Sequence, residues 1–203
     1  MSEKLVGNGV GLVREIALAS RVQKALETLY RVERSADVDA FLVHAGEGER
    51  ETLLVRESED GLEVSLRIPM LGAEGSLDPI CQIIEGVSHF VYLAHRAQRK
   101  REATQLELEL QAEVDKYVVL AASLQGFDET SSKKLRGRLY DAVSFLHRED
   151  SDEGERYRVA NAVARRFTAR LERDFLARAR FAELQQELRA FFHMGQGEKL
   201  RAA

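Results

Sequence analysis

The chain has little of the residues that break or staple a fold. Its 203 residues include two prolines, one cysteine and no tryptophan. Pro69 and Pro79 both lie in the first 80 residues, so no proline interrupts the rest of the chain, which can hold long helices. The single Cys81 excludes an intrachain disulfide and a zinc site built on paired cysteines. We therefore expect a mainly helical protein of a reducing compartment, with the cytoplasm as its location.

Long apolar runs are also missing. No window approaches the roughly 18 apolar residues that span a bilayer, and the first residues show no basic region followed by an apolar one. We expect no signal peptide and no membrane association. The hydrophobic fraction of 44% is nevertheless enough to build a core, and we expect one domain over residues 1–203.

The net charge of -4 is small, but the charge is unevenly distributed. Residues 1–129 hold 14 lysines and arginines against 23 acidic residues, and residues 130–203 hold 16 against 11. The two parts of the chain therefore have opposite sign, which would orient a partner or a second copy.

The first part of the chain predicts a helix and a small sheet in a subregion over residues 12–70. Apolar residues recur at helical spacing from Leu12 to about Glu33. Three apolar segments separated by glycine-containing turns then predict an antiparallel meander. These strands are expected at Ala40–Ala45, Glu51–Glu57 and Leu62–Ile68.

The second part predicts a bundle of four to five helices over residues 78–194. Asp78 as a cap and Pro79 at the first helical position would open a central helix that runs to about Lys100. Residues 195–203 are expected to be a frayed tail, so the fold class is α+β, predominantly α-helical. The other helices are expected at Thr104–Leu124, Ser132–Arg148, Glu153–Glu172 and Asp174–His193, with the last two free to be continuous.

Glu113 is a charged residue at a position where the helical pattern predicts an apolar one. It lies in the middle of the apolar stripe of its helix, and an unpaired buried charge costs several kcal/mol. It therefore needs a counter-ion, a metal or a proton. An ion pair with an arginine of the later helices, for which Arg156 is the candidate, is the favoured explanation.

A metal site is the alternative explanation for this region. Glu85 and His89 are spaced one helical turn apart, as are Glu109 and Glu113 on the next helix. Carboxylates and an imidazole from two facing helices would suit iron, manganese or zinc. Two observations argue against a metal. Familiar di-metal bundles use Glu-x-x-His, in which the glutamate and the histidine are three positions apart rather than four as here. Glu85 and His89 also lie opposite the apolar stripe of their helix, which predicts a solvated face.

Two further patterns are candidates for anion binding. Gly7, Gly9 and Gly11 precede a helix, but no strand precedes them and no Gly-Lys-Ser/Thr follows, so a flexible lead-in is favoured over a phosphate loop. Four arginines lie on the polar face of the helix from Glu153. They would contact phosphates or an acidic partner, although no nucleic-acid motif accompanies them. These arginines are Arg158, Arg165, Arg166 and Arg173.

The leading functional hypothesis is a protein-interaction, adaptor or regulatory protein without enzymatic activity or cofactor, which self-associates through its helices. Its basis is the apolar surplus on these helices, at Phe90, Tyr92, Leu93, Phe191 and Phe192. The alternatives are a metal-dependent enzyme with a divalent transition metal, and a nucleic-acid-binding protein that uses the arginine face. No Gly-x-Ser-x-Gly or His-Glu-x-x-His motif occurs to favour an enzyme.

Overall fold

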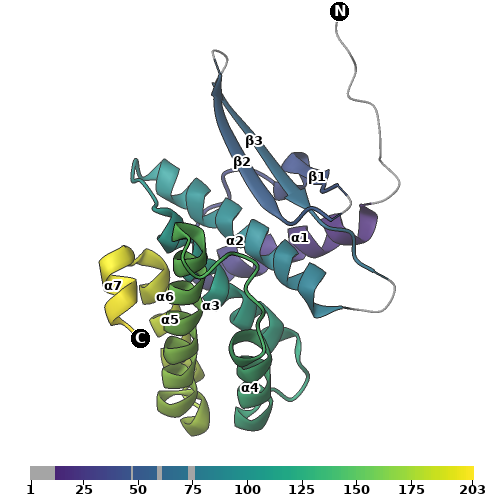
Figure 1. The fold of residues 1–203 in the computed structure, drawn as a ribbon. Coiled ribbons are helices and arrows are strands. Elements are labelled where there is room, and N and C mark those ends of the chain that lie inside the picture. The colour runs from purple at the N-terminus through teal and green to yellow at the C-terminus, as the bar shows by residue number, and fades with distance from the viewer. Residues whose placement is uncertain (1–11, 47, 59–60, 73–75) are drawn as a thin grey trace, which may run out of the picture.

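The computed structural model describes residues 12–203 except 47, 59–60 and 73–75. Helices dominate, and a small sheet accompanies them, so the fold class is α+β and predominantly helical, as predicted (Figure 1). None of the helices in this described part is long and apolar enough to cross a membrane. The elements are α1 (Val13–Tyr30), β1 (Leu42–His44), β2 (Thr52–Ser58), β3 (Gly61–Ile68), α2 (Leu77–Gln98), α3 (Gln105–Ser123), α4 (Glu129–Arg136), α5 (Asp152–Asp174), α6 (Phe181–His193) and α7 (Gln196–Arg201).

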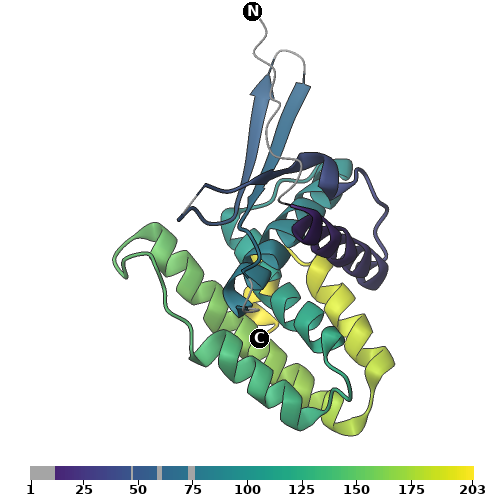
Figure 2. The same ribbon diagram turned by 90° about the vertical axis from the view of Figure 1, so that its right-hand side faces the viewer.

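The sheet is mixed, which corrects the predicted antiparallel meander. Its order is β1-β3-β2: β2 and β3 form the expected antiparallel hairpin, but β1 runs parallel to β3. β3 is central because its alternating apolar residues Leu66 and Ile68 are fully buried, and the strand pairs along both edges. The hairpin of β2 and β3 projects away from the helices (Figures 1 and 2).

α2 packs against α1, α3 and β3, and so is central as predicted. It begins at Leu77 with Ser76 as the residue before the helix, so the expectation that Asp78 caps it is wrong. Asp78 lies in the first turn and forms an ion pair with Arg50, at 3.1 Å, instead. The sheet approaches closely at Gly86, where a Cβ atom would lie 2.6 Å from Leu66 Cδ1.

The helix predicted at Ser132–Arg148 is shorter and begins earlier. Asp128 and Ser131 form a capping box that starts α4 at Glu129, and a π-helical turn at Gly137–Asp141 ends the helical part. The residues after it lack a surface to bury an apolar face, since Val143, Phe145 and Leu146 are exposed. Residues 142–150 therefore form an irregular segment.

The end of the chain also differs from the prediction. A 3-10 turn at Leu176–Arg178 and a left-handed Ala179 separate α5 from α6, so the two helices are not continuous and α6 packs against α1. The stretch expected to fray forms α7, which contacts α3. Its Lys199 is fully buried and donates to Gln111 Oε1 of α3 at 2.6 Å, which ties the helix to the core.

One large hydrophobic cluster joins the sheet to the helices. It contains four of the side chains that the sequence assigned to a dimer surface: Phe90, Tyr92, Phe191 and Phe192 are buried. Tyr30 and Tyr92 pack around the Phe192 ring, with centroids 4.2 and 5.2 Å away. The apolar surplus that suggested self-association is thus consumed by the core of the chain itself.

The glycines at positions 7, 9 and 11 lie outside the described residues.

Candidate functional site

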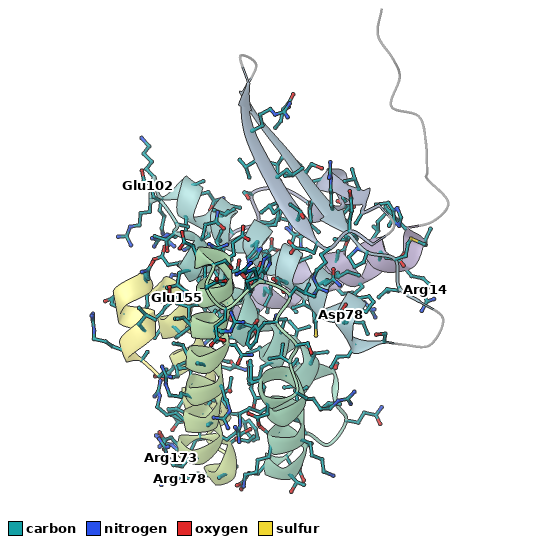
Figure 3. The ribbon with its side chains drawn as sticks, viewed as in Figure 1. Arg14, Asp78, Glu102, Glu155, Arg173 and Arg178 are labelled. Carbon is teal, nitrogen blue, oxygen red and sulfur yellow. The ribbon has the colours of Figure 1, made fainter. Side chains whose placement is uncertain are left out.

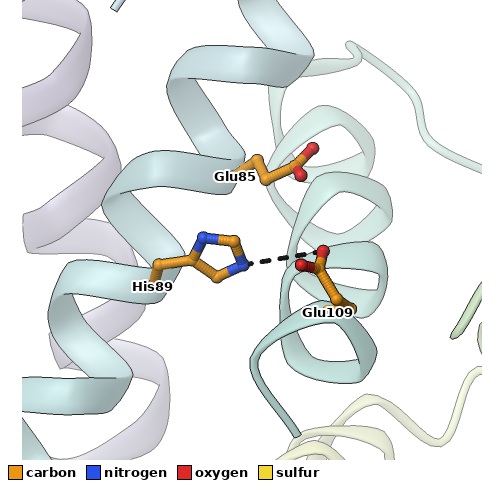
Figure 4. A group of neighbouring side chains, drawn as sticks. All are labelled: Glu85, His89 and Glu109. Atoms are coloured by element: carbon orange, nitrogen blue, oxygen red, sulfur yellow. Dashed lines mark ion pairs between the residues drawn. The ribbon is translucent and has the colours of Figure 1, made fainter. Parts of the chain in front are cut away.

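The residues that the sequence grouped as a metal site lie on two helices that pack against each other. α2 carries Glu85 and His89, and α3 carries Glu109 and Glu113. One ligand atom from each of Glu85, His89 and Glu109 lies within 4.8 Å of the other two (Figure 4). His89 Nε2 is 3.9 Å from Glu109 Oε2. Three of the four predicted residues therefore converge on one point.

The side of α2 that carries these residues is covered. His89 is 8% exposed, and the side chain of Glu85 is 13% exposed. The predicted solvated face is therefore wrong, because α3 and the residues before β2 pack over this side as well. A helix stripe identifies the most apolar face, but it does not say how many neighbours surround the helix.

Glu51 joins the cluster from outside the helices. Its Oε1 lies 3.7 Å from His89 Nδ1, and its backbone N–H donates to Gln82 Oε1 at 3.0 Å. Its side chain passes over Gly86, where an added Cβ would lie 2.8 Å from Glu51 Cγ. Sequence reasoning missed Glu51, since no local pattern indicates which strand-end residue meets α2.

Glu113 has a counter-ion on its own helix. Lys116 Nζ donates to Glu113 Oε1 at 2.8 Å and to Glu85 Oε2 at 3.1 Å. Arg156, the expected partner, forms no ion pair with Glu113 in the described structure. The spacing of Lys116, three residues after Glu113, is the usual signal for a pair on one helix, and it could have identified this lysine.

Two polar atoms of the cluster have no hydrogen-bond partner among the described residues. They are His89 Nε2 and Glu51 Oε1, and both are buried. The distances of 3.7 and 3.9 Å that separate the His89 nitrogens from Glu51 and Glu109 are too long for hydrogen bonds. Native proteins rarely leave such atoms unsatisfied, so the cluster offers unused donor and acceptor atoms to a bound group.

The electrostatics of the cluster are those of buried, crowded carboxylates. Burial raises the pKa of Glu109 to about 7 and also raises the pKa values of Glu51 and Glu113. Burial alone would raise the pKa of Glu85 too, but Lys116 and His89 lower it below its usual value. Burial lowers the pKa of His89, whereas Glu51 and Glu109 outweigh it and raise that pKa to about 9. The four carboxylates outnumber the two basic groups, and in the absence of a further cation this excess keeps the protons of Glu51, Glu109 and Glu113 bound to higher pH.

A cavity of about 370 Å³ adjoins the cluster. Glu51, Glu85, Glu113 and Lys116 line one side of it, and residues 143–147 with Tyr157 line the other. Glu51 and Glu85 thus belong both to the cavity wall and to the surroundings of His89. A group held at His89 would therefore lie next to a space large enough for a small molecule.

The segment that borders the cavity is fixed to the start of α5. Arg158 donates to the backbone carbonyls of His147 and Arg148, at 3.3 and 3.5 Å, and the His147 ring stacks on Tyr157 with centroids 5.2 Å apart. Gly154 is required at this junction because a Cβ there would lie 1.8 Å from the Arg148 carbonyl oxygen.

The predicted arginine face of α5 is mostly occupied by contacts within the chain. Arg158 holds the cavity segment, Arg165 pairs with Asp141 at 2.5 Å, and Arg173 pairs with Asp174 at 2.8 Å. Arg173 lies at the far end of the helix, near Arg178 of the following turn (Figure 3). Within the described chain Arg158 and Arg166 make no ion pair, but Arg158 donates to backbone carbonyls, so these arginines do not form a continuous free basic surface.

A second buried polar cluster lies nearby on α3, and sequence reasoning missed it. Asp115 accepts hydrogen bonds from Ser88, at 2.6 Å, from Gln111, at 2.9 Å, and from the Tyr30 hydroxyl. Lys199 of α7 donates to Gln111 Oε1 at 2.6 Å. Every member of this network has a partner.

Comparison with known proteins adds no further constraint. No protein-family model matches the chain, and no curated protein or solved structure matches it significantly.

Proposed function

We propose that the protein is a metal-dependent enzyme that binds a divalent transition-metal ion through Glu85, His89 and Glu109. The observation that carries this proposal is the approach of three ligand atoms within 4.8 Å of one another, one of them from a buried histidine whose Nε2 has no hydrogen-bond partner in the described chain. Carboxylate oxygens and an imidazole nitrogen suit iron, manganese or zinc. A hydrogen-bonded structural cluster would instead have donor–acceptor distances near about 2.9 Å.

The cavity beside the cluster supports an enzyme rather than a purely structural metal site. Structural sites are usually closed by four protein ligands, whereas catalytic sites keep a position open for water or substrate. Here three residues supply the ligands and Glu85 also borders the cavity of about 370 Å³. A metal ion at such a position acts as a Lewis acid on a bound oxygen atom. Glu51, 3.7 Å from His89 Nδ1, would orient the imidazole.

The test is the metal content of the full-length protein purified without chelator. We expect about one equivalent of a transition metal by elemental analysis, and a higher melting temperature when Mn²⁺, Fe²⁺ or Zn²⁺ is added. His89→Gln should abolish both effects. If no transition metal copurifies and none of the three ions raises the melting temperature, the proposal is wrong.

Glu113→Gln is the matched variant within the same cluster. Its carboxylate is bound by Lys116 at 2.8 Å and does not belong to the converging set, so metal binding should persist. Loss of metal in Glu113→Gln but not in Glu109→Gln would mean that the ligand set is wrong. Equal loss in both variants would indicate a general electrostatic attraction to acidic residues.

A second candidate function is the interaction protein favoured by the sequence, with self-association through the sheet rather than the helices. It is supported by the edge strand β2, where Leu54 and Val55 are 42% and 49% exposed. Exposed apolar edge strands pair readily with another strand. Light scattering should then detect a dimer that Val55→Lys dissociates, whereas a monomer at high micromolar concentration would contradict this function.

A further inference from the structure

A second cavity lies at the C-terminal end of α2, next to the C-terminal end of α6. It has a volume of about 300 Å³. Figure 3 labels Glu102, which belongs to the loop at this corner of the molecule. The lining consists of five basic or imidazole side chains and one phenylalanine, with no carboxylate among them. These residues are His95, Arg96, Arg99, Arg101, Phe192 and His193.

Basic residues also gather at helix C-termini because they interact with the last carbonyl oxygens. At the end of α2 the last carbonyl oxygens already accept backbone hydrogen bonds. The N–H groups of Arg99 and Arg101 donate to the Arg96 carbonyl at 3.1 and 3.0 Å, and Lys100 N–H donates to the Ala97 carbonyl at 2.9 Å. The guanidinium groups of Arg99 and Arg101 are therefore not needed to cap the helix.

The three arginines of the cavity have different roles. Arg96 donates to the Glu102 carbonyl at 2.6 and 3.0 Å and pairs with Glu107 at 3.5 Å, so it holds the loop in place. Arg99 and Arg101 form no ion pair with a carboxylate anywhere in the described residues. Arg99 instead contacts the His95 ring, which leaves positive charge facing an imidazole.

The backbone brings the two unpaired arginines to the same cavity. Lys100 between them has φ 53°, a left-handed conformation that is rare for a residue with a side chain. This reversal puts Arg99 and Arg101 in the lining, while Lys100 lies outside it. The left-handed residue belongs to an ordinary helix C-cap, with the Arg101 N–H bonded to the Arg96 carbonyl, and its consequence here is the convergence of the two arginines.

His95 and Phe192 give the cavity a buried wall. His95 is 7% exposed, and its ring lies 5.1 Å from Phe192 and 5.2 Å from His193, between ring centroids. Burial, together with Arg99 and His193, lowers the pKa of His95 to about 4. His95 is therefore neutral at physiological pH, and the positive charge of the cavity comes from its arginines. A bound anion would offset this charge.

We infer that this cavity binds the phosphate group of a small phosphorylated molecule, with Arg99 and Arg101 as the hydrogen-bond donors. Guanidinium groups match the oxygens of phosphate in paired hydrogen bonds, which suits an oxyanion better than a halide. The volume of about 300 Å³ lies at the small end of ligand pockets, so the occupant is a compact molecule rather than a nucleic-acid strand. The inference stands on residues separate from the converging ligand set at His89, and it does not depend on the proposed metal.

The test is isothermal titration of the full-length protein with inorganic phosphate and with pyrophosphate, against a background of chloride at physiological ionic strength. We expect saturable binding that Arg99→Ala and Arg101→Ala each weaken by about tenfold or more. Both side chains are exposed, so the variants should fold, which thermal unfolding will check. Lys100→Ala is the matched control, because it removes the same charge from the same loop but not from the cavity.

Several results would overturn the inference. One is the absence of saturable binding up to millimolar phosphate and pyrophosphate. Another is a loss of affinity in Lys100→Ala equal to that in Arg99→Ala and Arg101→Ala. A single-stranded oligonucleotide that binds more tightly than pyrophosphate, and that Arg166→Ala weakens as much as Arg99→Ala, would indicate an extended nucleic-acid surface instead. Unchanged phosphate affinity in His89→Gln would support the independence of the two sites, and a loss there would contradict it.

Discussion

Glu109 and Asp115 are buried carboxylates six residues apart on α3, and their surroundings are opposite in kind. Asp115 is 1% exposed and accepts hydrogen bonds from three side chains, Ser88, Gln111 and Tyr30. Glu109 is 4% exposed, and its charged neighbour His89 lies 3.9 Å away. Asp115 thus has a complete set of hydrogen-bond partners, whereas the described residues place His89 near Glu109 at a distance too long for a hydrogen bond.

This difference separates a structural cluster from a binding site. A buried polar network contributes to stability and to a unique packing when every member is satisfied. A buried group without a partner costs free energy in the unliganded protein, and such a cost is tolerated where a ligand later supplies the partner. The cluster at Asp115 should therefore matter for stability, and the one at His89 for binding.

At neutral pH the largest effect of a single substitution is expected from Asp115→Ala. The change leaves the buried hydroxyls of Ser88 and Tyr30 without their acceptor, so the free energy of unfolding should fall by about 3 kcal/mol. Urea denaturation measures this loss. Asp174→Ala, which removes a surface ion pair with Arg173, should cost far less, because solvent screens exposed pairs. If Asp115→Ala and Asp174→Ala were equally mild, the network around Asp115 would not be structural.

Glu109→Gln should behave in the reverse manner. Without metal, its free energy of unfolding should stay within about 1 kcal/mol of the original, because one of the crowded carboxylates is neutralised. With metal at about one hundred times its dissociation constant, the original protein should gain about 2.7 kcal/mol that the variant does not. Calorimetric unfolding with and without Mn²⁺ or Zn²⁺ measures both. A large loss of stability without metal would place Glu109 in the structural class.

Lys199 provides a pH-dependent test of the satisfied cluster. Burial lowers the pKa of Lys199 from 10.5 to about 7, although Asp115 and Glu107 act in the opposite direction and Arg96 adds to the lowering. Between these two values the unfolded chain binds a proton that the folded chain does not. Stability therefore rises with pH in that window, by up to about 1.4 kcal/mol per pH unit, and the contribution is lost as the pH falls toward 7.

Lys199→Met removes this titration while keeping the length of the side chain. The free energy of unfolding of the original protein minus that of the variant should increase as the pH rises from 7 to 10. Titrating groups that the two proteins share cancel in this difference. Urea denaturation at a series of pH values measures it. A difference that does not change with pH would contradict a neutral Lys199 in the folded protein.

Local sequence patterns predicted the elements well and their pairing less well. Alternation in β3 and helical periodicity in α2 are local properties, so both elements were predicted close to their observed positions. The parallel pairing of β1 with β3 depends on which edge of β3 is free, which no local pattern records. Val143, Phe145 and Leu146 continued a helical pattern, but the helix ended because no neighbour covers those side chains.

In the candidate site, too, local spacing predicted some residues, and contacts between distant segments determined the others. Glu85, His89 and Glu109 were predicted from spacing within two helices, and the packing of α2 on α3 brings them together. Lys116 followed from the same type of spacing but was missed. Glu51 and the buried Lys199 could not be predicted, since each meets its partners only through contacts between segments that are distant in the chain.

The smallest effect is expected from Gly86→Ala, which tests how Glu51 is positioned. The new methyl group would lie 2.6 Å from Leu66 Cδ1 and 2.8 Å from Glu51 Cγ, so both side chains must shift and the placement of Glu51 beside His89 is disturbed. Alanine favours a helix over glycine by about 1 kcal/mol, which partly offsets the crowding, and the net change in stability should be about 1 kcal/mol.

Metal affinity of Gly86→Ala should fall by about tenfold, because a displaced Glu51 no longer orients the imidazole of His89. Titration with Zn²⁺ monitored by calorimetry measures this loss. Gly72→Ala is the control, since a Cβ there meets nothing within 4 Å. Unchanged affinity in Gly86→Ala, with the stability loss present, would mean that Glu51 packs beside the site without acting on His89. The carboxylates that matter for binding would then be confined to α2 and α3.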